Sequence, residues 1–118
     1  MERLYELARL YDLYGGLLTG KQRECLRLHI AEDFSLAEIG EELGITRQAV
    51  HESIRRAERA LAEMEETLGF LARQQEQERD LTEIYTALNA LEEPISRGAV
   101  HEIAKQLEKY TETKEVGE

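Results

Sequence analysis

The sequence predicts an all-α fold with a long fourth helix and a helical C-terminal extension. The 118 residues include one proline and no tryptophan, and charged side chains make up 34% of the chain. Leucine, alanine, glutamate and arginine are abundant, and these residue types favour helices. Apolar residues recur at spacings of three and four, which places them on one face of an α-helix.

The composition also limits the classes of function. With 42% hydrophobic residues, the chain can build one modest core. Its net charge of −10 argues against binding nucleic acid by bulk charge, although a local basic face remains compatible with that charge. The sequence has neither an apolar run long enough to span a membrane nor a signal-peptide pattern at its start. We therefore expect a cytoplasmic protein with no membrane partner.

The first helix is expected from Leu4 to Tyr14, and its broad apolar stripe predicts that it is largely buried. The stripe consists of Leu4, Leu7, Ala8, Leu10, Tyr11, Leu13, Tyr14 and Leu17. Gly15-Gly16 ends this helix. A capping box that begins with Thr19 opens a second helix, which reaches about Glu32. Its expected inward residues are Leu26, His29 and Ile30.

Two more helices are predicted to meet at a tight turn. A second capping box, Ser35 with Glu38, opens a short helix. The apolar face of this helix is formed by Leu36, Ile39 and Leu43. Gly44 ends it, because glycine adopts the left-handed conformation at little cost. Thr46 then caps the next helix.

That next helix, the fourth, is expected to be long because its apolar residues follow a heptad seam. The seam consists of Val50, Ile54, Ala57, Leu61, Met64, Leu68 and Leu71. Its early part serves the domain core, whereas from Leu61 onward it extends beyond what a three-helix core requires. The polar segment Arg73–Asp80 is expected to be solvated.

Two further helices and a frayed end complete the predicted chain. The fifth helix is expected from Leu81 to Leu91, with Leu81, Ile84, Tyr85, Leu88 and Leu91 on one face. The sixth is expected from about Ser96 to Tyr110, with Val100, Ile103, Leu107 and Tyr110 inward. The last residues, Thr111–Glu118, are expected to be frayed.

Residues 35–60, SLAEIGEELGITRQAVHESIRRAERA, have the form of a helix-turn-helix. In this motif a short helix crosses the DNA backbone, and the helix after the turn lies in the major groove. Ala37 and Ala49 are small where the two helices approach each other. The alternative is a plain helical hairpin within a bundle.

The motif divides the chain into two predicted domains. Residues 1–66 form the helix-turn-helix domain, and residues 67–118 form a helical tail. Because a helix-turn-helix reads two half-sites as two copies at fixed spacing, we assign dimerisation to the tail. The seam can pack against the tail helices of the same chain or against a second chain, and we expect both.

Hydrogen-bonding side chains gather near the start of the fourth helix. The candidates for base contacts are Thr46, Arg47, Gln48, His51 and Glu52. Arginine suits the guanine edge and glutamine suits the adenine edge. Arg55 and Arg56 lie further along, where phosphate contact is expected. Lys21 and Arg23 begin the second helix and are either phosphate contacts or part of a solvated face.

Three segments of the chain resemble a known group. The segments Leu18–Leu28, Ser35–Ile39 and Gly44–Val50 are similar to the promoter-reading C-terminal domain of bacterial sigma factors. By that resemblance, Arg47, Gln48 and His51 occupy groove-facing positions, with Glu52 beside them.

The whole chain resembles more closely the helix-turn-helix proteins of the YlxM type. The resemblance covers the opening Leu4–Thr19 segment, the stretch ITRQAVHESIRRAE and the helical tail. It implies no enzymatic activity. Members of this family are usually encoded beside the signal recognition particle GTPase, which implies a role in that pathway.

Three functions are compatible with these features. They are a sequence-specific DNA-binding regulator, a protein adaptor of the targeting machinery, and an RNA-binding protein. The arginines between residues 47 and 59 favour DNA, since residues 46–60 hold four arginines against two glutamates, a local net charge of +2. The acidic balance of the whole chain favours the adaptor. No sequence feature singles out RNA.

The residues favour no enzyme, metal site or cofactor. His51-Glu52 and His101-Glu102 each begin like a zinc-protease motif but lack its second histidine. Cys25 and His29 have the spacing of a nucleophile and its base, although a partly buried structural pair fits them better. A single cysteine also excludes a disulfide framework and a multi-cysteine metal site.

Overall fold

The computed structural model describes residues 2–111, whose regular structure is all helical, as the sequence predicts. The α-helices are α1 (Glu2–Tyr14), α2 (Gly20–Ile30), α3 (Leu36–Leu43), α4 (Arg47–Leu68), α5 (Phe70–Asn89) and α6 (Arg97–Gln106). Two short 3₁₀ helices are η1 (Gly15–Leu17) and η2 (Glu108–Tyr110). The chain divides into two compact units, residues 1–73 and residues 74–118.

Side-chain caps begin α2, α3, α4 and α6. The capping box of α3 is complete: the Glu38 N–H donates to Ser35 Oγ at 3.1 Å, and the Ser35 N–H donates to Glu38 Oε1 at 2.8 Å. Thr46 Oγ1 accepts from the Ala49 N–H at 3.0 Å. Thr19 caps α2 in the same way at 3.3 Å. The predicted starts of these three helices are confirmed.

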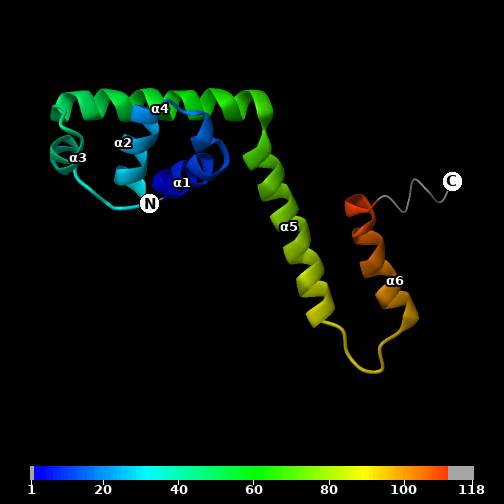
Figure 1. The fold of residues 1–118 in the computed structure, drawn as a ribbon. Coiled ribbons are helices and arrows are strands. Elements are labelled where there is room, and N and C mark those ends of the chain that lie inside the picture. Colours follow the sequence, from blue (N-terminus) through cyan, green and yellow to red (C-terminus); the bar gives the residue numbers. More distant parts are fainter. Residues whose placement is uncertain (1, 112–118) are drawn as a thin grey trace. The chain divides into compact units, whose positions relative to one another are not determined.

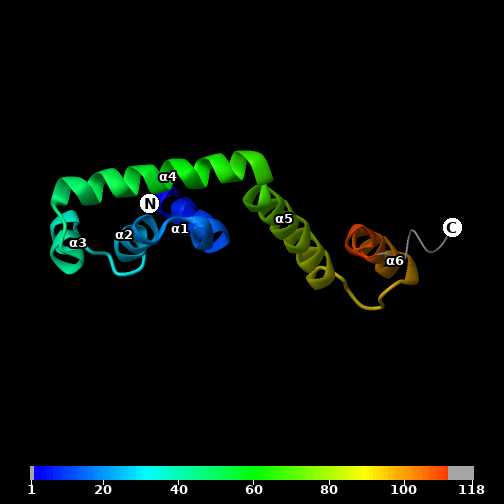
Figure 2. The same cartoon turned by 45° about the horizontal axis from the view of Figure 1, so that its top comes forward.

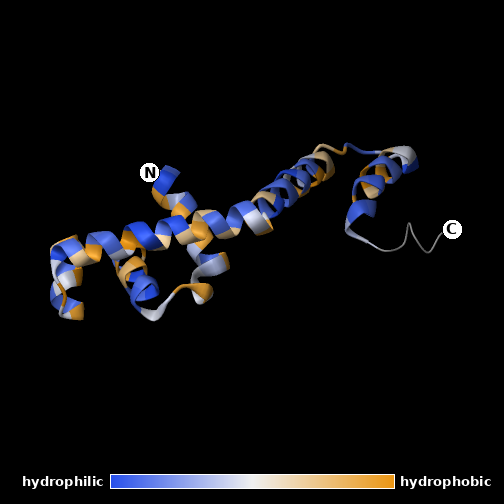
Figure 3. Ribbon diagram, turned by 90° about the horizontal axis from the view of Figure 1, so that it is seen from above, coloured by the Kyte–Doolittle hydropathy of each residue, from blue (hydrophilic) through white to orange (hydrophobic). Residues whose placement is uncertain are grey.

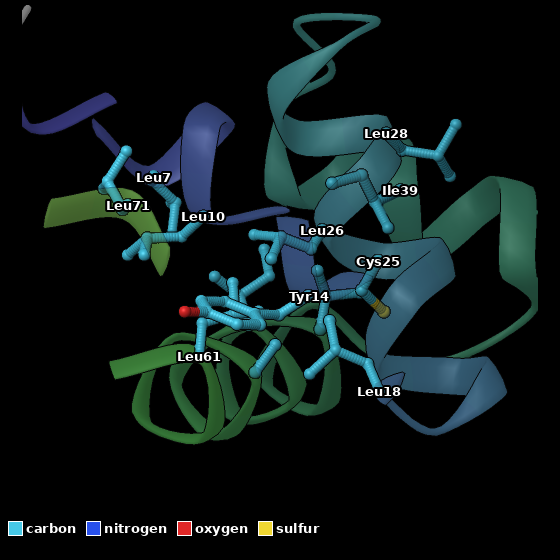
Figure 4. Close-up of a cluster of buried hydrophobic side chains, with 13 residues drawn as sticks. Leu7, Leu10, Tyr14, Leu18, Cys25, Leu26, Leu28, Ile39, Leu61 and Leu71 are labelled. Carbon is cyan, nitrogen blue, oxygen red and sulfur yellow. The ribbon is translucent and has the colours of Figure 1, made fainter. Parts of the chain in front are cut away.

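In the first unit, α4 lies across α1, α2 and α3 and forms one wall of the core (Figures 1 and 2). Figure 4 shows Leu10, Tyr14, Leu26 and Leu61 gathered at the centre of this core. Its buried side chains are Leu7, Leu10, Tyr14, Leu18, Cys25, Leu26, Leu28, Ile39, Val50, Ile54, Ala57, Leu61 and Leu71. Removing this apolar surface from water is the main favourable term in folding.

The predicted burial of α1 is too broad. Leu7, Leu10 and Tyr14 are buried, but Leu4 is 41% exposed and Leu17, just beyond the helix, is 67% exposed. The reason is that α1 packs mainly against α4, so one narrow face is covered. Ala8, Tyr11 and Leu13 are half-buried, and Tyr11 and Leu13 pack against the edge of the core.

The predicted inward face of α2 is also partly wrong. Leu26 is fully buried as expected, but His29 and Ile30 are half-buried. Cys25 and Leu28 are buried in their place. This helix packs against both α3 and α4, so its buried face is wider than predicted and is centred on different residues.

The helix α4 ends earlier than the heptad seam predicts. Gly69 adopts a left-handed conformation with φ of 65°, and its N–H donates to the Glu65 carbonyl at 2.8 Å. A new helix, α5, begins at Phe70. Residues 73–80 are mostly exposed, as expected, but they belong to α5 instead of preceding the fifth helix.

The turn at Gly69 changes the role of the seam. Leu61 is fully buried in the core of the first unit, and Leu71 is 4% exposed in the same core. Leu68, which lies between them in the sequence, is 40% exposed. The expectation that the seam outruns the core from Leu61 onward is therefore wrong, because the chain turns and returns Leu71 to that core.

The second unit contains the rest of α5 together with α6 and η2. Ile84 of α5 and Ile103 of α6 are buried. Asp80 joins α5 to η2: its Oδ2 accepts from Lys109 Nζ and from the Tyr110 hydroxyl, each at 2.8 Å. The expected frayed end lies outside the described residues from residue 112 onward.

Several apolar side chains of the second unit are exposed. Figure 3 shows hydrophobic positions alternating with hydrophilic ones along α5 and α6. The exposed apolar side chains of these two helices and of the residue that follows α6 include Leu81, Tyr85, Leu88, Val100 and Leu107. The predicted inward faces of these two helices are therefore only partly covered within one chain.

Candidate nucleic-acid interface

Two glycines set the turn between α3 and α4. Gly44 is left-handed with φ of 70°, as predicted. Gly40 lies where α3 meets the segment leading into α4, and a Cβ there would lie 2.7 Å from the Ile45 carbonyl oxygen. The Ile45 N–H donates to the Gly40 carbonyl at 3.0 Å. This close backbone contact fixes how α4 leaves the turn.

The two helices approach each other most closely at Gly40, and not at Ala37 and Ala49 as predicted. Ala37 is exposed and Ala49 is half-buried, whereas Gly40 is buried. The missed signal is an isolated glycine within a short amphipathic helix. Glycine there costs about 1 kcal/mol relative to alanine, so its presence indicates that packing leaves no room for a side chain.

The N-terminal end of α4 presents most of the predicted base-reading side chains to solvent. Arg47, Gln48 and His51 are exposed. Within residues 2–111, these three side chains form no hydrogen bond or ion pair, so their polar atoms are available to a ligand. The Thr46 hydroxyl, in contrast, is engaged as the cap of α4.

Two further candidates pair with each other. Glu52 Oε1 and Arg56 Nε lie 3.1 Å apart, one helical turn from each other on the exposed face of α4. Such an exposed pair stabilises a helix by only about 0.3–0.5 kcal/mol, but it offsets the charge of Arg56. Arg55 is exposed and has no acidic partner in the described part of the chain.

The structure groups seven of the nine predicted residues on one stretch of α4 and its cap, residues 46–56. Lys21 and Arg23 lie apart from them, in the first turns of α2. Both are exposed. The start of a helix favours anions because its first N–H groups lack intrahelical partners, which is compatible with phosphate contact there.

A cavity of about 760 Å³ opens beside this stretch of α4. Its lining comes from all of the first four helices: Arg3, Leu4, Leu7, His29, Leu36, His51, Ile54, Arg55, Glu58 and Arg59. Two predicted site residues, His51 and Arg55, therefore also line the cavity. Arg59 is not among the site residues predicted from the sequence, although His51, Arg55 and Arg59 recur at a spacing of four, which places them on one helical face.

The burial of Cys25 does not fit a nucleophile that His29 would activate as its base. This side chain is fully buried, so a substrate cannot reach its thiol, whereas His29 is half-buried at the cavity. Across residues 2–111, no three histidine, cysteine, aspartate or glutamate residues cluster in a way that could hold a metal ion. None of the helices in that range has the length and apolar character needed to cross a bilayer.

Comparison with known proteins agrees with this architecture. A family model described as "Putative helix-turn-helix protein, YlxM / p13 like" (UPF0122) matches residues 1–94. The chain is 46% identical over 100 residues to a UPF0122 protein of Symbiobacterium thermophilum, covering 85% of this chain and 94% of the relative. It is 41% identical over 103 residues to one of Thermoanaerobacter sp., covering 84% and 88%. It is 38% identical over 92 residues to one of Desulforamulus reducens, covering 78% and 79%.

Proposed function

The chain belongs to the YlxM/p13-like helix-turn-helix family, and we propose that it is a regulatory protein that reads duplex DNA with the start of α4. The observation that carries this proposal is the exposure of Arg47, Gln48 and His51 on a helix whose direction is held by the contact at Gly40. Arginine matches the acceptors of guanine, and glutamine matches the donor and acceptor of adenine.

The charge distribution defines how such binding would behave. The net charge of −10 repels phosphates at long range, so attraction comes from a few local contacts. Arg55 is the better phosphate contact because Arg56 is paired with Glu52. We therefore expect modest affinity that falls steeply with salt.

Selection from random duplexes at low salt tests the proposal with purified full-length protein. An enriched sequence that Arg47→Ala no longer selects is the expected result. Arg97→Ala is the matched control, since it removes one positive charge from an exposed position in α6, outside the helix-turn-helix. Failure to enrich any sequence, with wild-type and Arg47→Ala protein binding duplex equally, would reject DNA reading.

The proposed regulator is a homodimer, with residues 1–66 binding DNA and residues 67–118 joining two copies. The support is the set of apolar side chains that the second unit leaves uncovered, among which Leu81, Tyr85 and Leu88 of α5 are 51%, 68% and 52% exposed. Closed two-fold dimers bury such faces and place two recognition helices at a fixed spacing.

A second candidate function is that of an adaptor in the signal recognition particle pathway, which binds protein or RNA instead of DNA. The observation that favours it is the excess of 25 acidic over 15 basic side chains. Cosedimentation with the purified particle protein and, separately, with its RNA tests this function. Binding to either one, combined with no enriched duplex, would favour the adaptor over the regulator.

A further inference from the structure

We propose that the cavity bordered by α1, α2, α3 and α4 binds a small organic anion with an apolar ring body. The proposal concerns the basic cavity, defined by the ten lining residues given above. Its volume, about 760 Å³, lies within the range of about 300–1,000 Å³ that is typical of small-molecule sites.

The charged part of the basic cavity suits an anion. Its lining includes Arg3, Arg55 and Arg59 against the single carboxylate of Glu58, a local net charge of +2 on a chain whose net charge is −10. Glu58 Oε2 lies 2.9 Å from Arg3 Nη2, so this carboxylate is already engaged.

The two arginines of α4 that line the basic cavity are available to a ligand. Arg55 and Arg59 are exposed, and neither forms an ion pair or hydrogen bond within the part of the chain that the structure describes. They lie one turn apart, so their guanidinium groups can approach one bound anion. The planar guanidinium binds carboxylate, sulfonate or phosphate oxygens in pairs.

The remaining wall of the basic cavity is apolar. Leu7 and Ile54 are 8% and 6% exposed and form its most buried part, while Leu36 is half-buried and Leu4 is 41% exposed. An inorganic ion would leave this surface wet. A ligand with an aromatic or alicyclic body covers it, which is why the proposed ligand combines a ring with an acid group.

Occupancy of the basic cavity would compete with DNA, because His51 and Arg55 belong to both the cavity and the candidate interface. This consequence rests on the proposed function, whereas binding of the anion does not. The ligand would then act as an effector that releases DNA.

Fluorescence titration with anilinonaphthalene sulfonate tests the proposal, and the neutral N-phenylnaphthylamine serves as the uncharged probe. We expect saturable binding of one sulfonate probe per chain and much weaker binding of the neutral probe. Arg59→Gln should weaken sulfonate binding about tenfold, the usual effect of losing one charge-assisted hydrogen bond. Arg56→Gln is the matched control, since it removes the same charge from α4 outside the cavity lining.

A second variant tests the apolar wall. Leu4→Asn replaces an exposed side chain and should weaken both probes several-fold without unfolding the core. Equal affinity for the two probes, or equal effects of Arg59→Gln and Arg56→Gln, would overturn the proposal. If the probe fails to bind while an enriched duplex is still selected, the cavity proposal falls and the DNA proposal stands. If the probe binds while no duplex is selected, the DNA proposal falls and the cavity proposal stands.

Discussion

The hydroxyl of Tyr14 donates a 2.7 Å hydrogen bond to Glu65 Oε1 and so joins the end of α1 to the last turns of α4. The same hydroxyl accepts from the Phe70 N–H at 3.1 Å. Glu65 Oε1 accepts from the Leu71 N–H, and Oε2 accepts from the Ala72 N–H, each at 3.0 Å. Two side chains therefore satisfy the first three N–H groups of α5, which would otherwise lack partners.

Tyr14→Phe should destabilise the first unit. The substitution keeps the ring, which is 1% exposed and stacked 6.1 Å from Phe70, but removes a buried hydroxyl that bonds a carboxylate. Because a hydrogen bond to a charged group is lost, we expect a decrease of about 1.5–3 kcal/mol in the free energy of unfolding, measured with urea. Tyr5→Phe, at a side chain that is 65% exposed, is the control and should change it little. Equal effects would contradict the role given to the Tyr14 hydroxyl.

The carboxylate of Glu65 should make stability depend on pH. Burial raises the pKa of Glu65, but the hydrogen bonds from Tyr14, Leu71 and Ala72 outweigh burial and hold the pKa below its ordinary value of 4.5. The stabilisation is therefore complete above the unfolded-state pKa and is lost as pH falls through the lower folded-state pKa.

Glu65→Gln provides the measurement. The difference in unfolding free energy between wild type and Glu65→Gln should be largest near pH 7 and should shrink on acidification below the ordinary carboxyl pKa of 4.5. A difference that stays constant over this range would show that the charge of Glu65 contributes nothing.

Gly40→Ala should destabilise the turn between α3 and α4. The new Cβ would lie 2.7 Å from the Ile45 carbonyl oxygen, a backbone atom that cannot move without shifting the start of α4. We expect a loss of about 1–3 kcal/mol in thermal or urea unfolding. At Gly20 an added Cβ meets nothing within 4 Å, so Gly20→Ala is the control and should be neutral or slightly stabilising. A stable Gly40→Ala protein would contradict the packing at this turn.

Substitutions in α4 should separate base contacts from phosphate contacts. Arg47→Ala and Gln48→Ala should each lower specific affinity by about 1–3 kcal/mol and relax the preference at one base position. Arg55→Ala should weaken binding to all sequences and reduce the slope of log K against log salt by about one. Binding assays on the selected duplex at several salt concentrations measure both effects, with Arg97→Ala as the control. If all three substitutions weakened binding to every duplex sequence by the same factor, base reading would be contradicted.

Charged substitutions on α5 should separate the two copies. Leu81→Asp and Leu88→Asp would each bury an unpaired charge in the proposed interface and weaken association by about 3–5 kcal/mol. Thr86→Asp introduces the same charge on the same helix and is the control, since Thr86 lies outside the exposed apolar set. Sedimentation equilibrium measures the dissociation.

Leu61→Asp is unsuitable as a test of the dimer, because Leu61 is fully buried in the core of its own chain. A wild-type monomer at high micromolar concentration would reject the dimer.

Local signals in the sequence were enough to locate the helix-turn-helix. The capping box at Ser35 and Glu38, the left-handed Gly44 and the cap at Thr46 act over three or four residues, so their structure follows from neighbours in the chain. The exposure of Gln48 follows from helical spacing, because Gln48 lies across α4 from Val50, which is fully buried in the same turn.

Contacts between residues far apart in the chain decided the rest. Periodicity predicts one long seam through Leu71, but Gly69 ends α4 and returns Leu71 to the core, where Tyr14 and Glu65 cap the next helix. The basic cavity likewise combines Arg3 of α1 with Arg59 of α4. Hydrophobic spacing predicts which side of a helix is apolar. Which part of that side becomes buried depends on how many neighbouring helices reach it, and that follows only from tertiary packing.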